Sequence, residues 1–590
     1  MKKTICLVTL LCLLLAMLSA CGGDEPAAVG PIYAERGEVK REPLGNLSPA
    51  ADASGILNAL AAVGQSASAR WQPDYVETPK VGPRLNVNAE TGGETAVTDG
   101  ACIYMVDGYG LISVSAAGTA SEMRAYTKIE RVEEHWGDCL YLWKNQLAVV
   151  WTALKYESDG SWQGDVETKI MLFSVADPAA PKQLSEFSVD GSLVGACLLD
   201  GTLCVVTQKN LPSLPQADKA ETILPQLHEN GKTFTLQPGE IYLSDNPAKT
   251  ALTVAAAIRL EDGHFADALA FTDGTDAVRA EGQELYLART RWSEEASAPR
   301  TDASYTVVDY SAAAETEIKH LRLDGYLSLV DGCVLYGGLS DPGAMDIWNG
   351  QLRIATEVEE RSFSVYTDAA HGWTNCEEKS RVTDSQFTIL DEKLAVRGAL
   401  ARLGGEGGVA ACAFLCSHAW ITAGDTLTAA DLTDPAEPKL CGSFAAAGET
   451  LLLRELGNGC VLAFSIPAAG GKTRLSVYDL SDPANPKQLD SKELDAAPVG
   501  DLTAPGALFA DAASGLIGWP AAGKDKTEYR LVHWTGSKLA DKGSVAPEFV
   551  SDDARALLLN GLVYLCSPAS VSVIDPEAMK IVTTVSNAVG

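Results

Sequence analysis

The sequence predicts an all-β fold built from repeated units of short strands. One strand-and-turn signature recurs four times, glycine-containing turns open several apolar stretches of strand length, and no long amphipathic helical pattern follows about residue 85. A unit of about 40 to 50 residues built from short strands is the length of a β-propeller blade. We therefore expect a β-propeller of seven or eight four-stranded blades.

The recurring signature is an apolar stretch that ends in Asp-Pro, with a Lys four residues after the proline. Proline cannot extend a strand ladder because it has no N–H, and the aspartate can hydrogen-bond the turn backbone. We interpret the four copies as structural turns, since turn chemistry accounts for every residue. They are Asp177-Pro178, Asp434-Pro435, Asp482-Pro483 and Asp575-Pro576, and the last three are spaced by 48 residues and then by 93, close to twice 48.

Hairpin signals fill the chain between these copies. Apolar residues alternate or cluster over strand length on both sides of a turn in residues 104–114, 139–151 and 529–545. Glycine turns also open the apolar stretches that follow Asp200, Glu281 and Asn560.

Two features concern the number of blades and the way in which the ring closes. The segment from Gln208 to Tyr242 breaks the repeat, which leaves the blade number open between seven and eight. Because an open ring would expose a sheet edge, we expect closure by pairing a strand near Ile103–Val114 with the last blade, around Val563–Val585.

The N-terminus has the features of an export signal. Lys2 and Lys3 precede an apolar run that is shorter than the roughly 20 residues of a membrane span. The residues Leu18-Ser19-Ala20-Cys21 resemble the lipobox of bacterial lipoproteins. This resemblance implies a signal peptide over residues 1–20, cleavage before Cys21 and attachment of a diacylglycerol to the Cys21 thiol, which would hold the protein on a membrane surface.

The residues after Cys21 predict a tether that precedes the propeller. Residues 21–85 show little apolar periodicity, apart from a short helix expected from Ala50 onward with Ser48 as a possible cap and Gly55 as a weak point. The propeller domain then covers residues 86–590. Such a tether would let the propeller stand clear of the bilayer.

Three further segments carry a family resemblance. GAMDIWNGQLRIAT (343–356), SQFTILDEKL (385–394) and DLTDPAEPKLCGSF (431–444) resemble, in order and spacing, the secreted bacterial and archaeal β-propeller family distantly related to WD repeats. The resemblance implies a propeller domain in an exported protein, with no established activity and no catalytic residues to carry over. Family members often have a His-Pro pair where this chain has Arg454 and Glu455.

Charge and cysteine content narrow the possible partners and bonds. The chain has 46 basic and 78 acidic residues, which argues against nucleic acid and anionic lipid headgroups as partners. Of 14 cysteines, 11 remain after Cys6, Cys12 and Cys21 are set aside, and an odd number cannot all pair within one chain. We expect mostly free thiols, with a cross-strand bond from Cys197 left open.

A search for catalytic and metal-binding patterns returns little. The seven histidines are scattered, and H-E-x-x-H, Cys-x-x-Cys and G-x-S-x-G are absent from the sequence. The glycine cluster Gly404–Gly408 lacks the Lys-Ser/Thr of a phosphate loop and is interpreted as a loop between strands. Asp273-Gly-Thr-Asp276 is interpreted as a turn, with calcium as the minor alternative. We predict no catalytic residue and no metal ligand.

Eight tryptophans allow two interpretations, packing between blades and a carbohydrate-stacking face, and we favour packing. They are Trp136, Trp143, Trp292, Trp348, Trp373, Trp420, Trp519 and Trp534.

Together these features predict a monomeric lipoprotein whose propeller acts as a binding or scaffold module for an envelope protein or glycan, without enzymatic activity. It would lie on the outer face of the cell membrane, or on the periplasmic membrane surface if the source has two membranes. The alternative is an extracytoplasmic hydrolase or lyase with its active site at the channel mouth, because a propeller brings distant residues together and fold alone does not fix function.

Overall fold

The computed structural model describes most of the chain after residue 39. It describes residues 40–44, 47–63, 94–130, 135–156 and 162–586, apart from short gaps at 245–246, 248, 303–304, 340–343, 369, 372, 402, 404–410, 416, 424–425, 446–448, 467–471, 483–484, 495–497, 500–506 and 552–553. The predicted signal peptide, Cys21, Pro483 and the glycine cluster Gly404–Gly408 lie outside the described residues.

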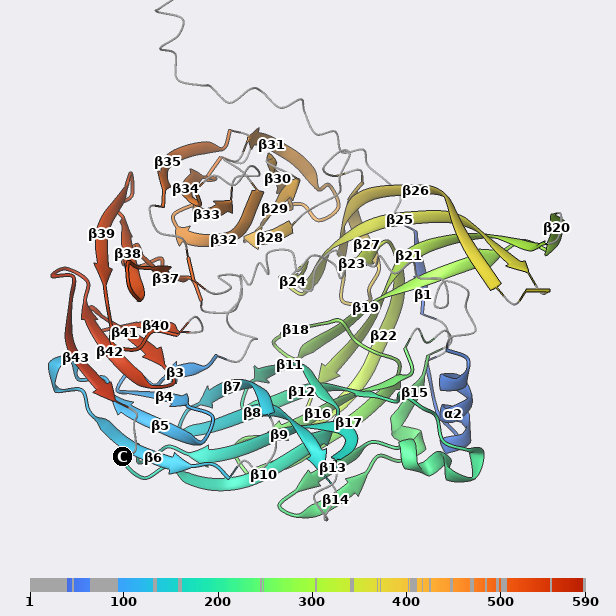
Figure 1. The fold of residues 1–590 in the computed structure, drawn as a ribbon, viewed down its shortest axis with the longest axis horizontal. Coiled ribbons are helices and arrows are strands. Elements are labelled where there is room, and N and C mark those ends of the chain that lie inside the picture. The colour runs from blue at the N-terminus through green and yellow to red at the C-terminus, as the bar shows by residue number, and fades with distance from the viewer. Residues whose placement is uncertain are drawn as a thin grey trace, which may run out of the picture.

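Eight sheets form a ring, and the chain visits them in order (Figure 1). The first sheet has β3 (Ala96–Thr98), β4 (Cys102–Val106), β5 (Gly110–Ser115) and β6 (Met123–Lys128), with the short helix η1 (Gly118–Ala120) before β6. The second has β7 (His135–Trp143), β8 (Gln146–Tyr156), β9 (Trp162–Ser174) and β10 (Lys182–Asp190), extended by β13 (Gln226–Glu229) and β14 (Lys232–Thr235). The third has β11 (Ser192–Leu199), β12 (Thr202–Asn210), β16 (Ala251–Arg259) and β17 (His264–Thr272), extended by β15 (Ile241–Leu243) and β2 (Ser48–Pro49).

The fourth sheet has eleven strands and contains two four-stranded sets. The first set is β18 (Ala277–Glu281), β19 (Glu284–Ala296), β21 (Tyr305–Leu323) and β22 (Leu327–Tyr336), joined by β1 (Arg41–Pro43) and β20 (Arg300–Asp302). The second is β24 (Met345–Trp348), β25 (Gln351–Asp368), β26 (Trp373–Leu390) and β27 (Val396–Ala401), joined by β23 (Gly338–Leu339). Pairing of β21 with β25, from Thr306 opposite Thr367 to Ala313 opposite Glu360, fuses the two sets. The far ends of these long strands project from the ring as an arm (Figure 1).

Four regular four-stranded sheets complete the ring. They are β28 (Ala411–Leu415), β29 (His418–Ala423), β30 (Thr426–Asp431) and β31 (Lys439–Ala445); β32 (Glu449–Gly457), β33 (Cys460–Ile466), β34 (Arg474–Asp479) and β35 (Lys487–Glu493); β36 (Phe509–Asp511), β37 (Leu516–Ala522), β38 (Thr527–Trp534) and β39 (Leu539–Val545); and β40 (Arg555–Leu559), β41 (Leu562–Ser567), β42 (Ser570–Asp575) and β43 (Lys580–Ser586).

The all-β propeller fold is therefore confirmed, while the number of blades is not. Counted as sheets the described residues form eight units, and counted as four-stranded sets they form nine, because the fused sheet contains two. The predicted hairpins are present as β4–β5, β7–β8 and β38–β39, and the glycine turns after Asp200, Glu281 and Asn560 open β12, β19 and β41.

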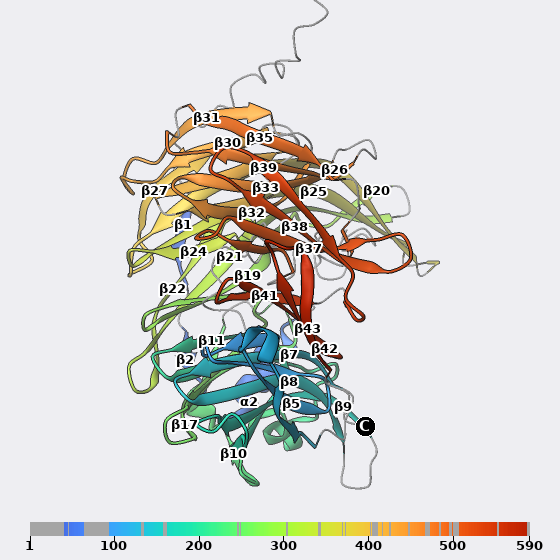
Figure 2. The same cartoon turned by 90° about the vertical axis from the view of Figure 1, so that its left-hand side faces the viewer.

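The ring closes by side-chain packing, and the predicted pairing of N- and C-terminal strands is wrong. The first and last sheets are neighbours (Figures 1 and 2), but their strands belong to two separate ladders. Ile103, Met105 and Ile112 pack with Tyr564 and Val573 in one apolar cluster. Each blade already completes its own ladder, so closure requires contact between sheet faces and needs no shared strand pair.

The expectation of a free tether does not hold over the described residues 41–44 and 47–61. β1 pairs with β22 of the fused sheet and β2 pairs with β15 of the third sheet. The helix α2 (Ala53–Ala61) is capped by Asp52, whose carboxylate accepts the Gly55 N–H at 2.8 Å, and not by Ser48. Its residues Ile56 and Leu60 are fully buried in the cluster between the second and third sheets. One short helix thus forms, and packing against the ring offsets the low helix propensity of Gly55.

The segment that breaks the repeat adds strands to neighbouring sheets. Between β12 and β16 the chain forms η2 (Ala217–Ile223), β13, β14, η3 (Pro238–Glu240) and β15. β13 pairs with β10 of the second sheet, and β15 pairs in parallel with β17 of the third. This excursion therefore covers sheet edges that would otherwise be open.

A buried network of charges lies between the third sheet and the fused sheet. Arg289 on β19 pairs with Asp273 at the end of β17 and with Glu317 on β21, the latter at 2.5 Å. Lys319 also pairs with Glu317, and all four side chains are at most 4% exposed. Burial would raise the pKa of the Glu317 carboxyl, but Lys319 and Arg289 outweigh it and hold that pKa at about 2.

This depressed pKa predicts a loss of stability in acid. Because the pKa of Glu317 is lower in the folded chain than its ordinary value of 4.5, its contribution is present above pH 4.5 and disappears as the pH falls toward 2. We expect the difference in unfolding free energy between the wild-type chain and Glu317→Gln to shrink by about 3 kcal/mol between pH 6 and pH 2. Urea unfolding at several pH values measures it, with the exposed Glu577→Gln as control. A difference that does not vary with pH would contradict the prediction.

Candidate functional site

The aspartates of the predicted Asp-Pro pairs lie where the third strand turns into the fourth in four different sheets. Asp177 and Asp434 each accept a hydrogen bond at 3.0 Å from the backbone N–H two residues later. Asp575 accepts the N–H groups of Glu577 and Ala578 at 2.9 Å, and these bonds lower the pKa of its carboxyl. The Asp482 backbone carbonyl accepts the Asn485 N–H at 2.9 Å.

Two of these turns also touch the preceding sheet. The Pro178 carbonyl accepts a hydrogen bond at 2.5 Å from the Ser113 hydroxyl of β5. The Pro435 carbonyl lies so close to Gly398 of β27 that a Cβ there would stand 2.3 Å from it. The structure does not gather the turns into one site; each acts within its own blade, and two of them also act at a blade junction.

The first strand of each set lies innermost and faces the axis of the ring (Figure 1). Contacts between β3 and β7, between β28 and β32, between β32 and β36, and between β36 and β40 run around this inner circle (Figure 1). Residues that are far apart in the sequence therefore meet here. The charged ones among them are the best candidates for a functional site.

The charged groups of Glu94, Arg454 and Arg555 lie within electrostatic reach of one another on this inner circle, and we call them the channel site. Glu94 forms an isolated bridge to Leu140 of β7 just before β3, Arg454 lies on β32, and Arg555 begins β40. Arg555 is 9% exposed, and the Arg454 guanidinium donates a hydrogen bond at 3.1 Å to the Leu453 carbonyl. The site thus joins three sheets and carries two cationic groups and one acidic group.

Burial dominates the electrostatics of this group. It raises the pKa of the Glu94 carboxyl, and Arg555 and Arg454 offset the rise only in part. It also lowers the pKa of the Arg454 guanidinium to about 10, which Glu94 again offsets in part. Among the ion pairs of the described residues none involves Arg454. An anion placed beside Arg454 would relieve the cost of burying its charge.

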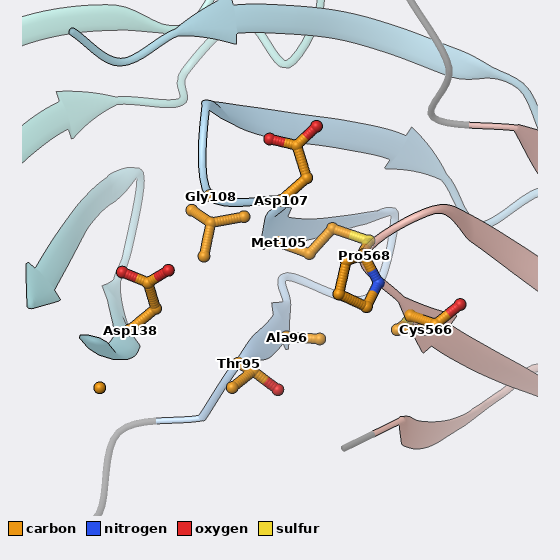
Figure 3. Close-up of a pocket in the computed structure, with 11 residues that line it drawn as sticks. Thr95, Ala96, Met105, Asp107, Gly108, Asp138, Cys566 and Pro568 are labelled. Carbon is orange, nitrogen blue, oxygen red and sulfur yellow. The ribbon is translucent and has the colours of Figure 1, made fainter. Parts of the chain in front are cut away.

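A pocket of about 410 Å³ lies at the junction of the first, second and last sheets, and two of its wall residues neighbour Glu94 and Arg555 (Figure 3). Thr95, which follows Glu94, lines it, as does Cys566, which lies directly opposite Arg555 on β41. Asp138 lies on the opposite side of the pocket from Cys566. The other wall residues include Ala96, Met105, Asp107, Gly108, Gly137, Ser567 and Pro568.

Some of these tryptophans are buried between sheets, and others are exposed. Trp420, Trp519 and Trp534 are buried between C-terminal sheets, and Trp143, Trp292 and Trp348 are partly buried. Trp373 is 41% exposed at one end of β26, and Trp136 on β7 is 49% exposed. They form no single stacking face, but Trp136 immediately precedes the pocket residues Gly137 and Asp138.

The structure gives Asp273 and Asp276 partners other than calcium. The Asp273 carboxylate pairs with Arg289 and accepts the Lys249 N–H at 2.9 Å. Asp276 pairs with the Lys249 ammonium at 2.8 Å and accepts the Thr290 N–H at 2.8 Å. Across the part of the chain that the structure describes, no three His, Cys, Asp or Glu side chains are grouped to hold a metal ion.

Sequence reasoning missed Glu94 and Arg555 and noted Arg454 only as a departure from a family pattern. No local signal marks these residues, because the ring alone brings them together. Among the described helices, none has the length and apolar character to cross a membrane.

Comparisons with known proteins agree with this architecture. The chain is 23% identical over 434 residues to an uncharacterized protein of Methanocaldococcus jannaschii, covering 62% of this chain and 63% of that protein. It is 25% identical over 247 residues to an uncharacterized protein of Archaeoglobus fulgidus, covering 41% of this chain and 34% of that protein. The chain thus spans less than two thirds of the length of either relative.

A solved structure of a protein from Lactobacillus plantarum aligns with a TM-score of 0.27 and 9% identity, covering 57% of this chain and 92% of that one, a likeness too low to carry an argument. The model of the beta propeller domain family matches residues 93–579. The chain therefore belongs to the beta propeller domain family.

Proposed function

We propose that this protein is a membrane-anchored, extracytoplasmic binding module that uses its channel site to recognise an acidic group on an envelope glycan or protein. The observation that carries the proposal is the meeting of Arg454, Arg555 and Glu94 beside a pocket. Buried arginines bind carboxylates and phosphates through charge-assisted hydrogen bonds. The exposed Trp136, which precedes the pocket residues Gly137 and Asp138 in the sequence, favours a glycan over a protein, because aromatic faces offer flat apolar area with a polar edge.

The lipobox-like sequence before Cys21 supports the membrane anchor. β1 begins at Arg41 and pairs with the ring, so only about 20 residues separate the proposed lipid from the propeller. Fully extended, that length of chain reaches at most about 70 Å. The propeller would then stay within this distance of the bilayer. Metabolic labelling with a fatty acid, with Cys21→Ala as control, tests the anchor, and equal label in both chains would refute it.

Partner capture tests the binding role directly. The bait must begin before Lys40, because a chain that starts near residue 85 would lack β1, β2 and α2. We expect the immobilised chain to retain a saturable species from envelope extract or an acidic glycan panel. Capture of nothing beyond what an unrelated lipoprotein retains would count against the proposal.

The arginines of the channel should control affinity for an acidic probe. We expect the chain to bind oligogalacturonate better than its methyl ester, and Arg454→Gln to weaken that binding roughly 10- to 100-fold, since a hydrogen bond to a charged group is worth about 1.5 to 3 kcal/mol. Titration calorimetry at low and high salt measures the effect. The matched control is Arg474→Gln. Arg474 lies on β34 of the same sheet and pairs with Glu493 on the outer strand β35. Equal affinity for the acid and its ester, or an unchanged Arg454→Gln chain, would contradict the prediction.

The raised pKa of Glu94 favours a second candidate, a hydrolase or lyase of acidic glycans. A carboxyl that remains protonated at higher pH can act as a general acid, and the arginines beside it would hold the anionic substrate. Glu94→Gln separates the two functions. In a binding module this variant binds at least as tightly, because it removes a negative charge, and neither chain releases new glycan ends. In an enzyme the wild-type chain releases them and the variant loses 100-fold or more of the rate.

A further inference from the structure

Cys197 and Cys204 lie directly opposite each other on β11 and β12 of the third sheet. Facing residues of an antiparallel pair have Cα atoms about 4.5 to 5.5 Å apart, within the range of about 4.4 to 6.8 Å that a disulfide requires. The Cys204 thiol also acts on the Cys197 thiol and raises its pKa. Among the strand pairings of the described residues, no other cysteine faces a cysteine.

We propose that Cys197 and Cys204 form a disulfide when the chain folds in the presence of a small-molecule or protein disulfide. The thiolate of one cysteine attacks a sulfur of the oxidant, which breaks the S–S bond of the oxidant and releases its first thiol. The thiolate of the other then attacks the mixed disulfide and releases the second thiol. The chain loses two electrons and two protons, and the oxidant gains them as two thiols.

Because both cysteines are buried in the folded chain, the disulfide must form before folding is complete. Cys197 is 1% exposed and Cys204 is fully buried, and the neighbouring Cys204 thiol together with burial raises the pKa of Cys197 well above its ordinary value. The Cys197 thiolate is therefore scarce, and both sulfurs are inaccessible to an oxidant, once the ring has closed. The bond forms while the β11–β12 hairpin exists but the neighbouring blades have not yet covered it. The expected export of the chain would supply an oxidising compartment.

The other described cysteines provide internal controls. Cys102, Cys333, Cys412 and Cys566 are also buried, but face Ser115, Ile318, Ile421 and Val571 across their strands. A general tendency of buried thiols to oxidise would affect them as well. The proposal requires that the bond be specific to Cys197 and Cys204.

Refolding and peptide mapping test the proposal. The full chain is refolded with a mixture of oxidised and reduced glutathione, its remaining thiols are alkylated, and it is digested without reduction by a protease that cleaves before aspartate. Cleavage before Asp200 separates the two cysteines, so only a disulfide keeps their fragments together. We expect that linked pair in the wild-type and Cys333→Ser chains and its loss in Cys204→Ser. We also expect chains folded without oxidant to keep both thiols when glutathione disulfide is added afterwards.

Either of two results would overturn the proposal. Alkylation of both Cys197 and Cys204 after oxidative refolding would show that they do not join. Linkage of Cys197 to several cysteines with no preference for Cys204 would show that their facing positions do not direct the bond. Because the decisive measurement uses the wild-type chain, a variant that fails to fold does not remove the test.

Discussion

Replacing Arg289 by glutamine should lower the free energy of unfolding by about 3 to 5 kcal/mol, the usual cost of removing one partner from a buried ion pair. The substitution removes the cation that Asp273 and Glu317 share, and both carboxylates are fully buried. Lys319 still neutralises part of the charge on Glu317, and Asp273 keeps backbone N–H donors such as that of Lys249. Urea unfolding of the full chain followed by tryptophan fluorescence measures the loss.

The matched control for Arg289 is Arg300→Gln on β20. Arg300 pairs with Asp309, and both side chains are 48% exposed. Exposed pairs are worth about 0 to 1 kcal/mol, so this variant should unfold nearly as the wild-type chain does. If both variants lost the same unfolding free energy, burial would not explain the contribution of the Arg289 ion pairs to stability.

The second large loss of unfolding free energy is expected for a substitution at Trp519 on β37. Its side chain is fully buried between the sheets of β32–β35 and β36–β39, where it packs with Leu462, Phe464 and Val532. Trp519→Ala would open a cavity in this blade junction, and such substitutions cost about 3 to 5 kcal/mol. Urea unfolding again measures the loss.

Trp136→Ala is the control for Trp519, because Trp136 is 49% exposed. It should leave the unfolding free energy within about 0.5 kcal/mol of the wild-type value, since exposed positions away from buried features contribute little. If the proposed glycan site is correct, the same variant binds oligogalacturonate less tightly. A large loss of stability at Trp136, or none at Trp519, would contradict the assigned packing.

Local sequence patterns predicted the strands and turns well because their physics is local. The Asp107-Gly108 turn, for example, forms with Asp107 accepting the N–H groups of Tyr109 and Gly110 at 3.0 and 2.9 Å. The fold class followed from repetition of such units. Blade number did not follow, because the fusion of β21 with β25 depends on two strands of 19 and 18 residues that pair beyond the ring.

Contacts between residues that are far apart in the chain could not be predicted from the sequence. Nothing near Arg41 or Ile56 predicts that these residues meet the ring, because the strand and sheets that receive them lie far along the chain. The channel site has the same origin. Glu94, Arg454 and Arg555 belong to no recognisable sequence motif, and only the order of blades around the ring gives them a common environment.

Closure of the ring through face packing has a consequence for synthesis. The hydroxyl of Tyr564 in the last sheet accepts a hydrogen bond from the Gly118 N–H beside the first, across 446 residues of chain. At about 5 to 20 residues per second, a ribosome needs on the order of 20 to 90 s to make that stretch. Throughout this interval the apolar face formed by Ile103, Met105 and Ile112 has no partner from the last sheet. The nascent chain is thus vulnerable to aggregation at its first blade, and a chaperone that shields this face until the last sheet emerges would raise the yield of closed rings.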